Sequence, residues 1–244
     1  GNILASRENN YYEWRFGKIR YLKKGSGTPV LLLHNLTVGS SSYEFHYMID
    51  DLAKHHEVYA FDFLGYGLSD KPNMTYTNYM YVQLLNDFIK NVIGRKTNVI
   101  ATGDAAPVCI MTCHNEPELF SKLTLINPPS LFHLNQIPSN QLKALKLLFE
   151  IPILGTFIYN MLTTKRMFTK AFQDEYFFHP HNMKDTDLLA YVEASHVSDY
   201  NSKYSYASFI SKYMNANIVH ALKEINHSIY IIGGKEILNN QTTL

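Results

Sequence analysis

The 244-residue sequence predicts an α/β protein with a mostly parallel, doubly wound sheet and a helical insertion. Residues 29–34 form a continuous apolar run, which is typical of a strand buried on both faces of a parallel sheet. From residue 43 to 127, strand-like and helix-like stretches alternate, which indicates parallel strands joined by crossover helices. Residues 128–217 then show helical periodicity and many aromatics but no convincing strand pattern, which predicts the insertion.

The elements are expected in a simple order. Alternating aromatic residues on either side of Gly17 predict an N-terminal hairpin of strands 11–16 and 18–23. The periodicity then predicts strands at 29–34, 57–63, 98–103 and 122–127, helices at 43–55 and 77–94, and, after the insertion, a helix at 219–225 and a strand at 227–234. We therefore expect a core of residues 1–127 and 218–244 and a helical cap of residues 128–217.

Composition narrows the class of partner. The net charge is +1 and no run of five like charges occurs, so the chain has no electrostatic footprint for nucleic acid or an anionic membrane. A small apolar or acyl-type molecule is the expected partner. The longest apolar stretch, residues 144–162, is interrupted by Lys146, Glu150 and Pro152, which favours cap helices over a bilayer span.

Cysteine and histidine usage predicts neither a disulfide framework nor a metal or other cofactor. Cys109 and Cys113 lie four apart on one face of an expected helix, where free cysteines behave as small apolar residues. The 11 histidines show no HExxH motif and no paired ligand spacing. The chain begins with Gly1, which suggests a processed end, so we expect a cytoplasmic protein or one tethered by a removed N-terminal segment.

The stretch around residues 97–113 carries the most informative motif. An apolar strand runs into the small residues 103–107, and a helical stretch follows. This strand, tight turn and helix is the context in which G-x-S-x-G places a serine nucleophile at the apex of a strained turn. We place Ala105 at that apex. An alanine keeps the turn and removes the hydroxyl.

Three motifs in order then resemble one family. His34-Asn35-Leu36 resembles a His-Gly-x oxyanion loop, residues 62–70 resemble a D-x-x-G-x-G-x-S-D turn, and residues 103–107 fall at the nucleophile turn. Together with the insertion, the three motifs resemble the α/β-hydrolase superfamily over about residues 11–234. The general character of the sequence resembles that of uncharacterised α/β-hydrolases of low-GC gut bacteria. The resemblance implies the α/β-hydrolase fold and hydrolysis of small ester, amide or similar carbonyl substrates.

The resemblance also implies a site. Two backbone N–H groups hold the oxyanion in this family, and by position they belong to Leu36 and Ala106. Asn35 replaces a glycine in the loop, and because asparagine tolerates left-handed backbone geometry, we expect the oxyanion hole to survive. The expected pocket is bordered by His34, Asn35 and apolar cap residues, namely Phe132, Leu147, Phe157, Tyr159 and Met161.

The rest of a serine triad is not found in the sequence. Glu236 is a weak candidate for the acid, and no histidine follows His227 before Leu244. The chain as given is therefore expected to be inactive and to lack the last strand and helix of the fold. Strand residues 228–232 would then form an open edge, which predicts that a homodimer forms through this seventh strand or that residues 235–244 fold back to cover it.

Two alternatives stay open. Counting back from Pro117 favours Gly103 or Asp104 as the apex instead of Ala105. Asp104 would then act as a carboxylate nucleophile of the epoxide-hydrolase or dehalogenase type, or serve as a carboxylate at a helix N-terminus. The second alternative is a non-catalytic protein that binds an apolar ligand in a lidded pocket.

Overall fold

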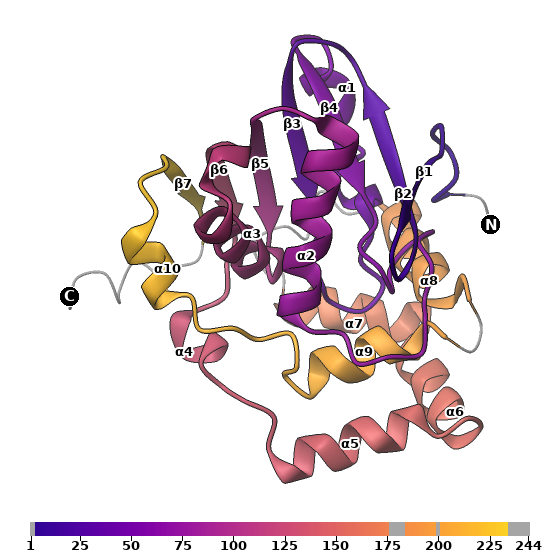
Figure 1. Ribbon diagram of the computed structural model, residues 1–244. Coiled ribbons are helices and arrows are strands. Elements are labelled where there is room, and N and C mark those ends of the chain that lie inside the picture. The colour runs from indigo at the N-terminus through magenta and orange to yellow at the C-terminus, as the bar shows by residue number, and fades with distance from the viewer. Residues whose placement is uncertain (1–2, 176–183, 199–200, 234–244) are drawn as a thin grey trace.

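A seven-stranded sheet with helices on both faces forms the centre of the structure, a computed structural model that describes residues 3–175, 184–198 and 201–233 (Figure 1). The strands are β1 (Asn10–Trp14), β2 (Gly17–Lys24), β3 (Thr28–Leu33), β4 (His56–Phe61), β5 (Thr97–Thr102), β6 (Phe120–Ile126) and β7 (Ile229–Ile232). Their order is β1-β2-β4-β3-β5-β6-β7. The pairs β1/β2 and β2/β4 are antiparallel and all other pairs are parallel, which confirms the predicted mostly parallel sheet.

Strand β3 is the buried centre that its apolar run predicts. Residues 29–33 are all buried, and β3 pairs in parallel with β4 on one side and β5 on the other. The N-terminal hairpin is confirmed as well, because Trp14 pairs with Gly17 across the turn between β1 and β2.

The first crossover differs from the sequence prediction. The single helix expected at 43–55 is wrong, since the chain forms two short helices, η1 (Ser42–Phe45) and α1 (Ile49–Leu52). Tertiary contacts hold the first one: the Ser42 N–H donates to Asp62 Oδ1 at 2.8 Å, and the Glu44 carboxylate turns inward to Thr102. Such contacts override local helix propensity.

The helices that cover the sheet follow the predicted periodicity. Helix α2 (Asn78–Phe88) begins after Thr77, whose hydroxyl accepts the Met80 N–H at 3.2 Å. It continues as the π-helical turn η2 (Ile89–Ile93), which ends at Gly94. The remaining core helices are α3 (Ala105–Asn115), the short η3 (Pro117–Leu119) and α10 (Val219–Glu224). Both cysteines of α3 are free and buried, as expected.

The insertion lies between β6 and α10, at one end of the sheet (Figure 1). Its helices are α4 (Leu131–Leu134), α5 (Asn140–Glu150), α6 (Leu154–Leu162), α7 (Lys165–Glu175), α8 (Asp185–His196) and α9 (Lys203–Ile210), and its described residues contain no strand. No single helix in the described residues is long and apolar enough to cross a membrane. Only α5 and α6 together, bent by 99°, have the necessary length and composition.

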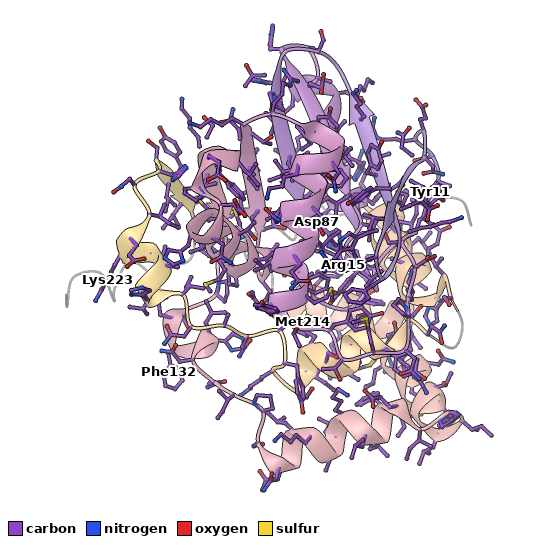
Figure 2. The ribbon with its side chains drawn as sticks, viewed as in Figure 1. Tyr11, Arg15, Asp87, Phe132, Met214 and Lys223 are labelled. Atoms are coloured by element: carbon purple, nitrogen blue, oxygen red, sulfur yellow. The ribbon has the colours of Figure 1, made fainter. Side chains whose placement is uncertain are left out.

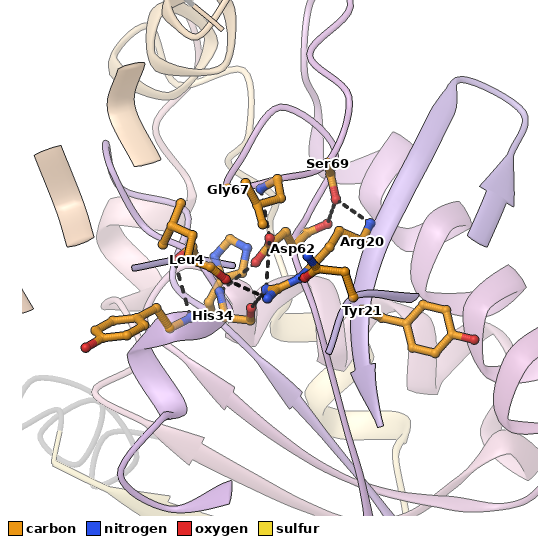
Figure 3. Close-up of polar contacts among 12 residues, drawn as sticks. Leu4, Arg20, Tyr21, His34, Asp62, Gly67 and Ser69 are labelled. Carbon is orange, nitrogen blue, oxygen red and sulfur yellow. Dashed lines mark hydrogen bonds and ion pairs between the residues drawn. The ribbon is translucent and has the colours of Figure 1, made fainter. Parts of the chain in front are cut away.

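A buried ion pair ties the N-terminal segment to the sheet (Figure 3). Arg20 Nη1 lies 3.4 Å from Asp62 Oδ2, and both side chains are almost fully buried. The Arg20 guanidinium also donates to the Leu4 carbonyl at 2.7 Å and to Asn9 Oδ1 at 2.8 Å. Burial alone raises the pKa of the Asp62 carboxyl, but Arg20 and the backbone N–H donors overcome it and lower that pKa. The ionised Arg20–Asp62 pair therefore holds the turn after β4 in place.

Strand β7 lies at one edge of the described sheet. It pairs with β6 only, within the residues that the structure describes, and the side chains of Tyr230 and Ile232 are more than half exposed. The homodimer through this strand stays a prediction. Glu236 and the rest of residues 234–244 lie outside the described residues.

The turn at residues 65–67 generates a stability prediction. Gly67 has φ +52°, and a Cβ built there would lie 2.4 Å from Asp62 Cγ. Gly94 has φ +70° but no atom within 4 Å of its Cβ position. Gly94→Ala should therefore cost only backbone strain, about 1 kcal/mol, whereas Gly67→Ala should cost about 3 kcal/mol or more in the free energy of unfolding. Equal losses in urea denaturation would contradict the assigned role of Asp62.

Candidate functional site

The turn between β5 and α3 has its strained residue at Gly103. Gly103 has φ +53°, in the left-handed region that favours glycine, whereas Asp104 has φ −71° and ψ −6°. Ala105 is the first residue of α3 and is fully buried. The prediction that Ala105 is the apex is therefore wrong by two residues, and the alternative count from Pro117, which allowed Gly103, fits the geometry. The apex carries no side chain.

The Asn35 side chain lies against this apex. Asn35 Oδ1 accepts hydrogen bonds from the Leu36 N–H at 2.8 Å and from the Asp104 N–H at 2.9 Å. Because two donors converge on one atom, that atom must be the carbonyl oxygen of the side-chain amide and not its nitrogen. One amide from the loop after β3 and one from the residue after the apex thus share a single acceptor.

This arrangement corrects two expectations for the oxyanion hole. The Ala106 N–H is not part of it, since it donates to the Gly103 carbonyl at 3.1 Å, and Asp104 supplies the second donor instead. Asn35 is not left-handed either, because the described non-glycine residues with positive φ are Asn127 and Lys212. Asn35 acts through its side chain instead, whose oxygen accepts both N–H groups at the place where we expected an oxyanion hole.

The space at the apex is equally restricted. A Cβ built on Gly103 would lie 2.4 Å from Asn35 Oδ1, 2.5 Å from its Cγ and 2.6 Å from its Nδ2. Side-chain carbons do not approach other heavy atoms so closely. Any residue other than glycine at position 103 would therefore require Asn35 to move. The identities of the two residues depend on each other.

His34 holds the loop after β3 through both of its ring nitrogens. Its Nε2 accepts the Phe63 N–H at 3.0 Å, so its Nδ1 carries the proton and donates to the Asn35 carbonyl at 2.6 Å. The side chain is fully buried, and burial lowers the pKa of His34 although Asp62 opposes that shift. A neutral imidazole thus fixes the loop to the strand end. That His34 borders a substrate pocket stays a prediction.

Glu44 is a partly buried acid that the sequence pattern did not reveal. Its Oε1 accepts the Thr102 hydroxyl at 2.7 Å, and its Oε2 accepts the Asn35 N–H at 3.2 Å. Burial raises the pKa of Glu44 to about 7 despite these donors. Its place inside an expected amphipathic helix gave no signal, because only the break between η1 and α1 turns it toward the loop.

Asp104 lies beside the apex with a helical backbone. It precedes the first residue of α3, and its carboxylate makes no capping hydrogen bond to that helix. Burial raises the pKa of Asp104, and His133 on α4 opposes that shift only in part. The environment therefore makes ionisation of Asp104 less favourable than it is for an exposed aspartate.

The cap residues expected to line the pocket do not gather at the turn. Phe132, Leu147, Phe157 and Met161 are each more than half exposed, and Figure 2 shows Phe132 on the outer side of α4. Tyr159 is buried, and its hydroxyl donates to the Ser195 carbonyl at 2.8 Å.

Tyr159 is the one member of this set that lies near the oxyanion loop. It borders a cavity of about 10 Å³, room for about one water molecule, with Val38, Gly39 and Tyr66 among its neighbours. Tyr66 in turn donates to the Leu36 carbonyl at 2.5 Å. Tyr159 of the insertion and Tyr66 of the core thus both line the small cavity beside the loop.

The parallel sheet and the strand, tight turn and helix at Gly103 define an α/β hydrolase architecture. A model of the alpha/beta hydrolase fold family matches residues 28–164, more than half of the chain. The chain belongs to this family, as the motifs of the sequence indicate.

Individual relatives share less. The chain is 34% identical over 116 residues to the 2-hydroxy-6-oxo-6-(2'-aminophenyl)hexa-2,4-dienoic acid hydrolase of Metapseudomonas resinovorans, a match that covers 46% of this chain and 39% of that protein. Among solved structures, a serine hydrolase involved in carbazole degradation has a TM-score of 0.68 at 19% identity, covering 93% of this chain and 90% of the other. An epoxide hydrolase from Vigna radiata has a TM-score of 0.72 at 16% identity, covering 97% and 84%. The structural likenesses show the shared fold.

Glu44 predicts a pH-dependent stability difference. A carboxyl whose pKa is raised stabilises the fold while it is protonated, and this contribution is lost as the pH rises to about 7. Glu44→Gln keeps a neutral amide in place of the acid. The variant should match the parent at pH 4 and exceed it at pH 8 by about 1 to 3 kcal/mol in the free energy of unfolding. Glu8→Gln, at an exposed site, controls for the loss of one charge; a constant difference across this range would contradict the assignment.

Proposed function

We propose that this chain is a non-catalytic member of the α/β hydrolase family with respect to serine-type ester and amide hydrolysis. The observation that carries the proposal is the Asn35 carboxamide oxygen, which accepts both the Leu36 and the Asp104 N–H groups beside a glycine apex. In this proposal the chain keeps the strand, turn and helix of the site, and the Asn35 side chain occupies the place of the substrate oxygen.

Acyl hydrolysis at this turn has two structural requirements. A nucleophile must project from the apex, and two N–H groups must be free to hold the negative oxygen that develops on the substrate carbonyl. Gly103 supplies no nucleophile. The two N–H groups already have an acceptor at 2.8 and 2.9 Å, so a substrate oxygen would have to displace it.

Displacement is unfavourable because Asn35 is part of the same chain. An intramolecular acceptor pays no translational entropy to reach its donors, whereas a free substrate does. The carboxamide oxygen also resembles a substrate carbonyl oxygen in charge and geometry. Asn35 therefore acts as a permanent internal ligand of the two amides, and the loss of the nucleophile at position 103 supplies the room that it needs.

An aspartate-nucleophile enzyme that uses Asp104 has less support. An attacking carboxylate must be ionised, and burial raises the pKa of Asp104. Its backbone is helical, so the strained position belongs to its neighbour Gly103. A non-catalytic protein could still bind a small apolar or acyl-type molecule. Such a ligand would make its contacts without the Leu36 and Asp104 N–H groups.

The direct activity test uses a chromogenic ester. With p-nitrophenyl butyrate the chain should show no turnover above background, because losing the nucleophile of a serine triad costs on the order of a millionfold. A fluorophosphonate probe should leave the intact mass unchanged. Turnover above about one per second, or a labelled serine, would refute the proposal.

The coupling between positions 35 and 103 is tested by a double-mutant cycle. Gly103→Ala should cost about 3 kcal/mol or more in the parent, since it adds backbone strain and a clash with Asn35. In the Asn35→Gly background only the strain, about 1 to 2 kcal/mol, should remain. Additive losses within about 0.5 kcal/mol would contradict the occupied site.

A further inference from the structure

Three potential metal ligands meet on the surface between α3 and α10. His114 lies in the last turn of α3, and His220 and Glu224 lie four residues apart on α10. Residues four apart lie on the same face of a helix, so His220 and Glu224 point in one direction, toward the end of α3.

The ligand atoms already lie close together. His114 Nε2 is 2.5 Å from Glu224 Oε2, and His220 Nε2 is 3.1 Å from Glu224 Oε1. One ligand atom from each of the three residues lies within 4.8 Å of the other two. The two imidazole rings stand 5.7 Å apart between centroids and at 73° to each other. A cation placed between them would require only small side-chain rotations.

We propose that His114, His220 and Glu224 form a binding site for a borderline transition-metal dication such as Zn²⁺. Two imidazole nitrogens and one carboxylate oxygen are ligands that Zn²⁺ accepts, and three protein ligands leave a fourth position for water. Harder cations such as Mg²⁺ and Ca²⁺ prefer all-oxygen ligands, so this donor set selects against them.

The exposure of the three residues fits a site that is open to solvent. The side chains of His114, His220 and Glu224 are 27%, 77% and 51% exposed. Water can therefore reach the fourth position. Strongly exposed ligands also keep much of their rotational freedom, so we expect a dissociation constant in the micromolar range and not the much tighter binding of a buried structural site.

Metal binding at this site would displace a proton. His114 Nε2 and Glu224 Oε2 share a hydrogen bond, and a nitrogen or oxygen ligand must give up its proton to coordinate a metal. Zn²⁺ would therefore replace the proton between these two atoms.

A bound cation would join two segments that are distant in sequence. Helix α3 begins directly after the Gly103 turn, and α10 leads into β7. Bridging them adds a link between the central part of the sheet and its β7 edge. Metal that binds only the folded state raises stability by mass action.

The sequence alone indicates only two of the three proposed metal ligands. The spacing His220-x-x-x-Glu224 lies within the expected helix 219–225, but it gives two ligands only. The third, His114, comes from about a hundred residues earlier, and only the packing of α10 against α3 brings it into the set.

Isothermal titration of the chain with ZnCl₂ at pH 7.5 tests the site. We expect one Zn²⁺ per chain, and binding weakened at least about tenfold in each of His114→Ala, His220→Ala and Glu224→Gln. His55→Ala removes an exposed histidine elsewhere and should bind as the parent does. Thermal unfolding gives a second readout: a hundredfold excess of Zn²⁺ over the dissociation constant should raise the Tm by about 5 °C in the parent and in His55→Ala only.

Several outcomes would overturn the proposal. These are the absence of Zn²⁺ binding, binding that survives all three substitutions, and equal binding of Mg²⁺. Circular dichroism of each variant confirms the fold, and Glu224→Gln preserves side-chain shape if an alanine variant is poorly folded. The result does not depend on the proposed loss of hydrolysis, because the Gly103 turn is unchanged in every variant.

Discussion

Two hydrogen bonds to one oxygen define the chemistry of this site. Asn35 Oδ1 joins the loop after β3 to the first residue after the Gly103 apex, at 2.8 and 2.9 Å. The same side chain leaves no space for a Cβ on Gly103. The satisfied N–H donors and the missing Cβ at position 103 therefore depend on each other, since the Asn35 side chain occupies the space that a Cβ on Gly103 would need.

Further hydrogen bonds hold the surroundings of this contact in place. His34 donates to the Asn35 carbonyl, and Glu44 accepts the Asn35 N–H. Both backbone polar groups of Asn35 are therefore hydrogen-bonded to side chains. Behind the loop, the buried Arg20–Asp62 pair fixes the turn after β4. The framework that presents two amides in an α/β hydrolase is thus retained, while the group that they bind is supplied from within the chain.

The sequence predicted most of the framework for physical reasons that are local. The apolar run of β3, the hairpin around Gly17 and the glycines at 65 and 67 each follow from side-chain period or backbone freedom. The sequence does not show which residue lies at the apex of the turn, because residues 103–107 are all compatible with a tight turn. The role of Asn35 is not visible in the sequence for a different reason, because its side chain acts on Asp104, 69 positions further along the chain.

The most direct test is a crystal structure of this chain at a resolution that defines the Asn35 carboxamide. The account predicts Asn35 Oδ1 within hydrogen-bonding distance, about 2.7 to 3.2 Å, of both the Leu36 and Asp104 nitrogens, with Gly103 in the left-handed region. An Asn35 side chain turned away from the apex, with water or a bound anion on the two amides, would show an open oxyanion hole and contradict it.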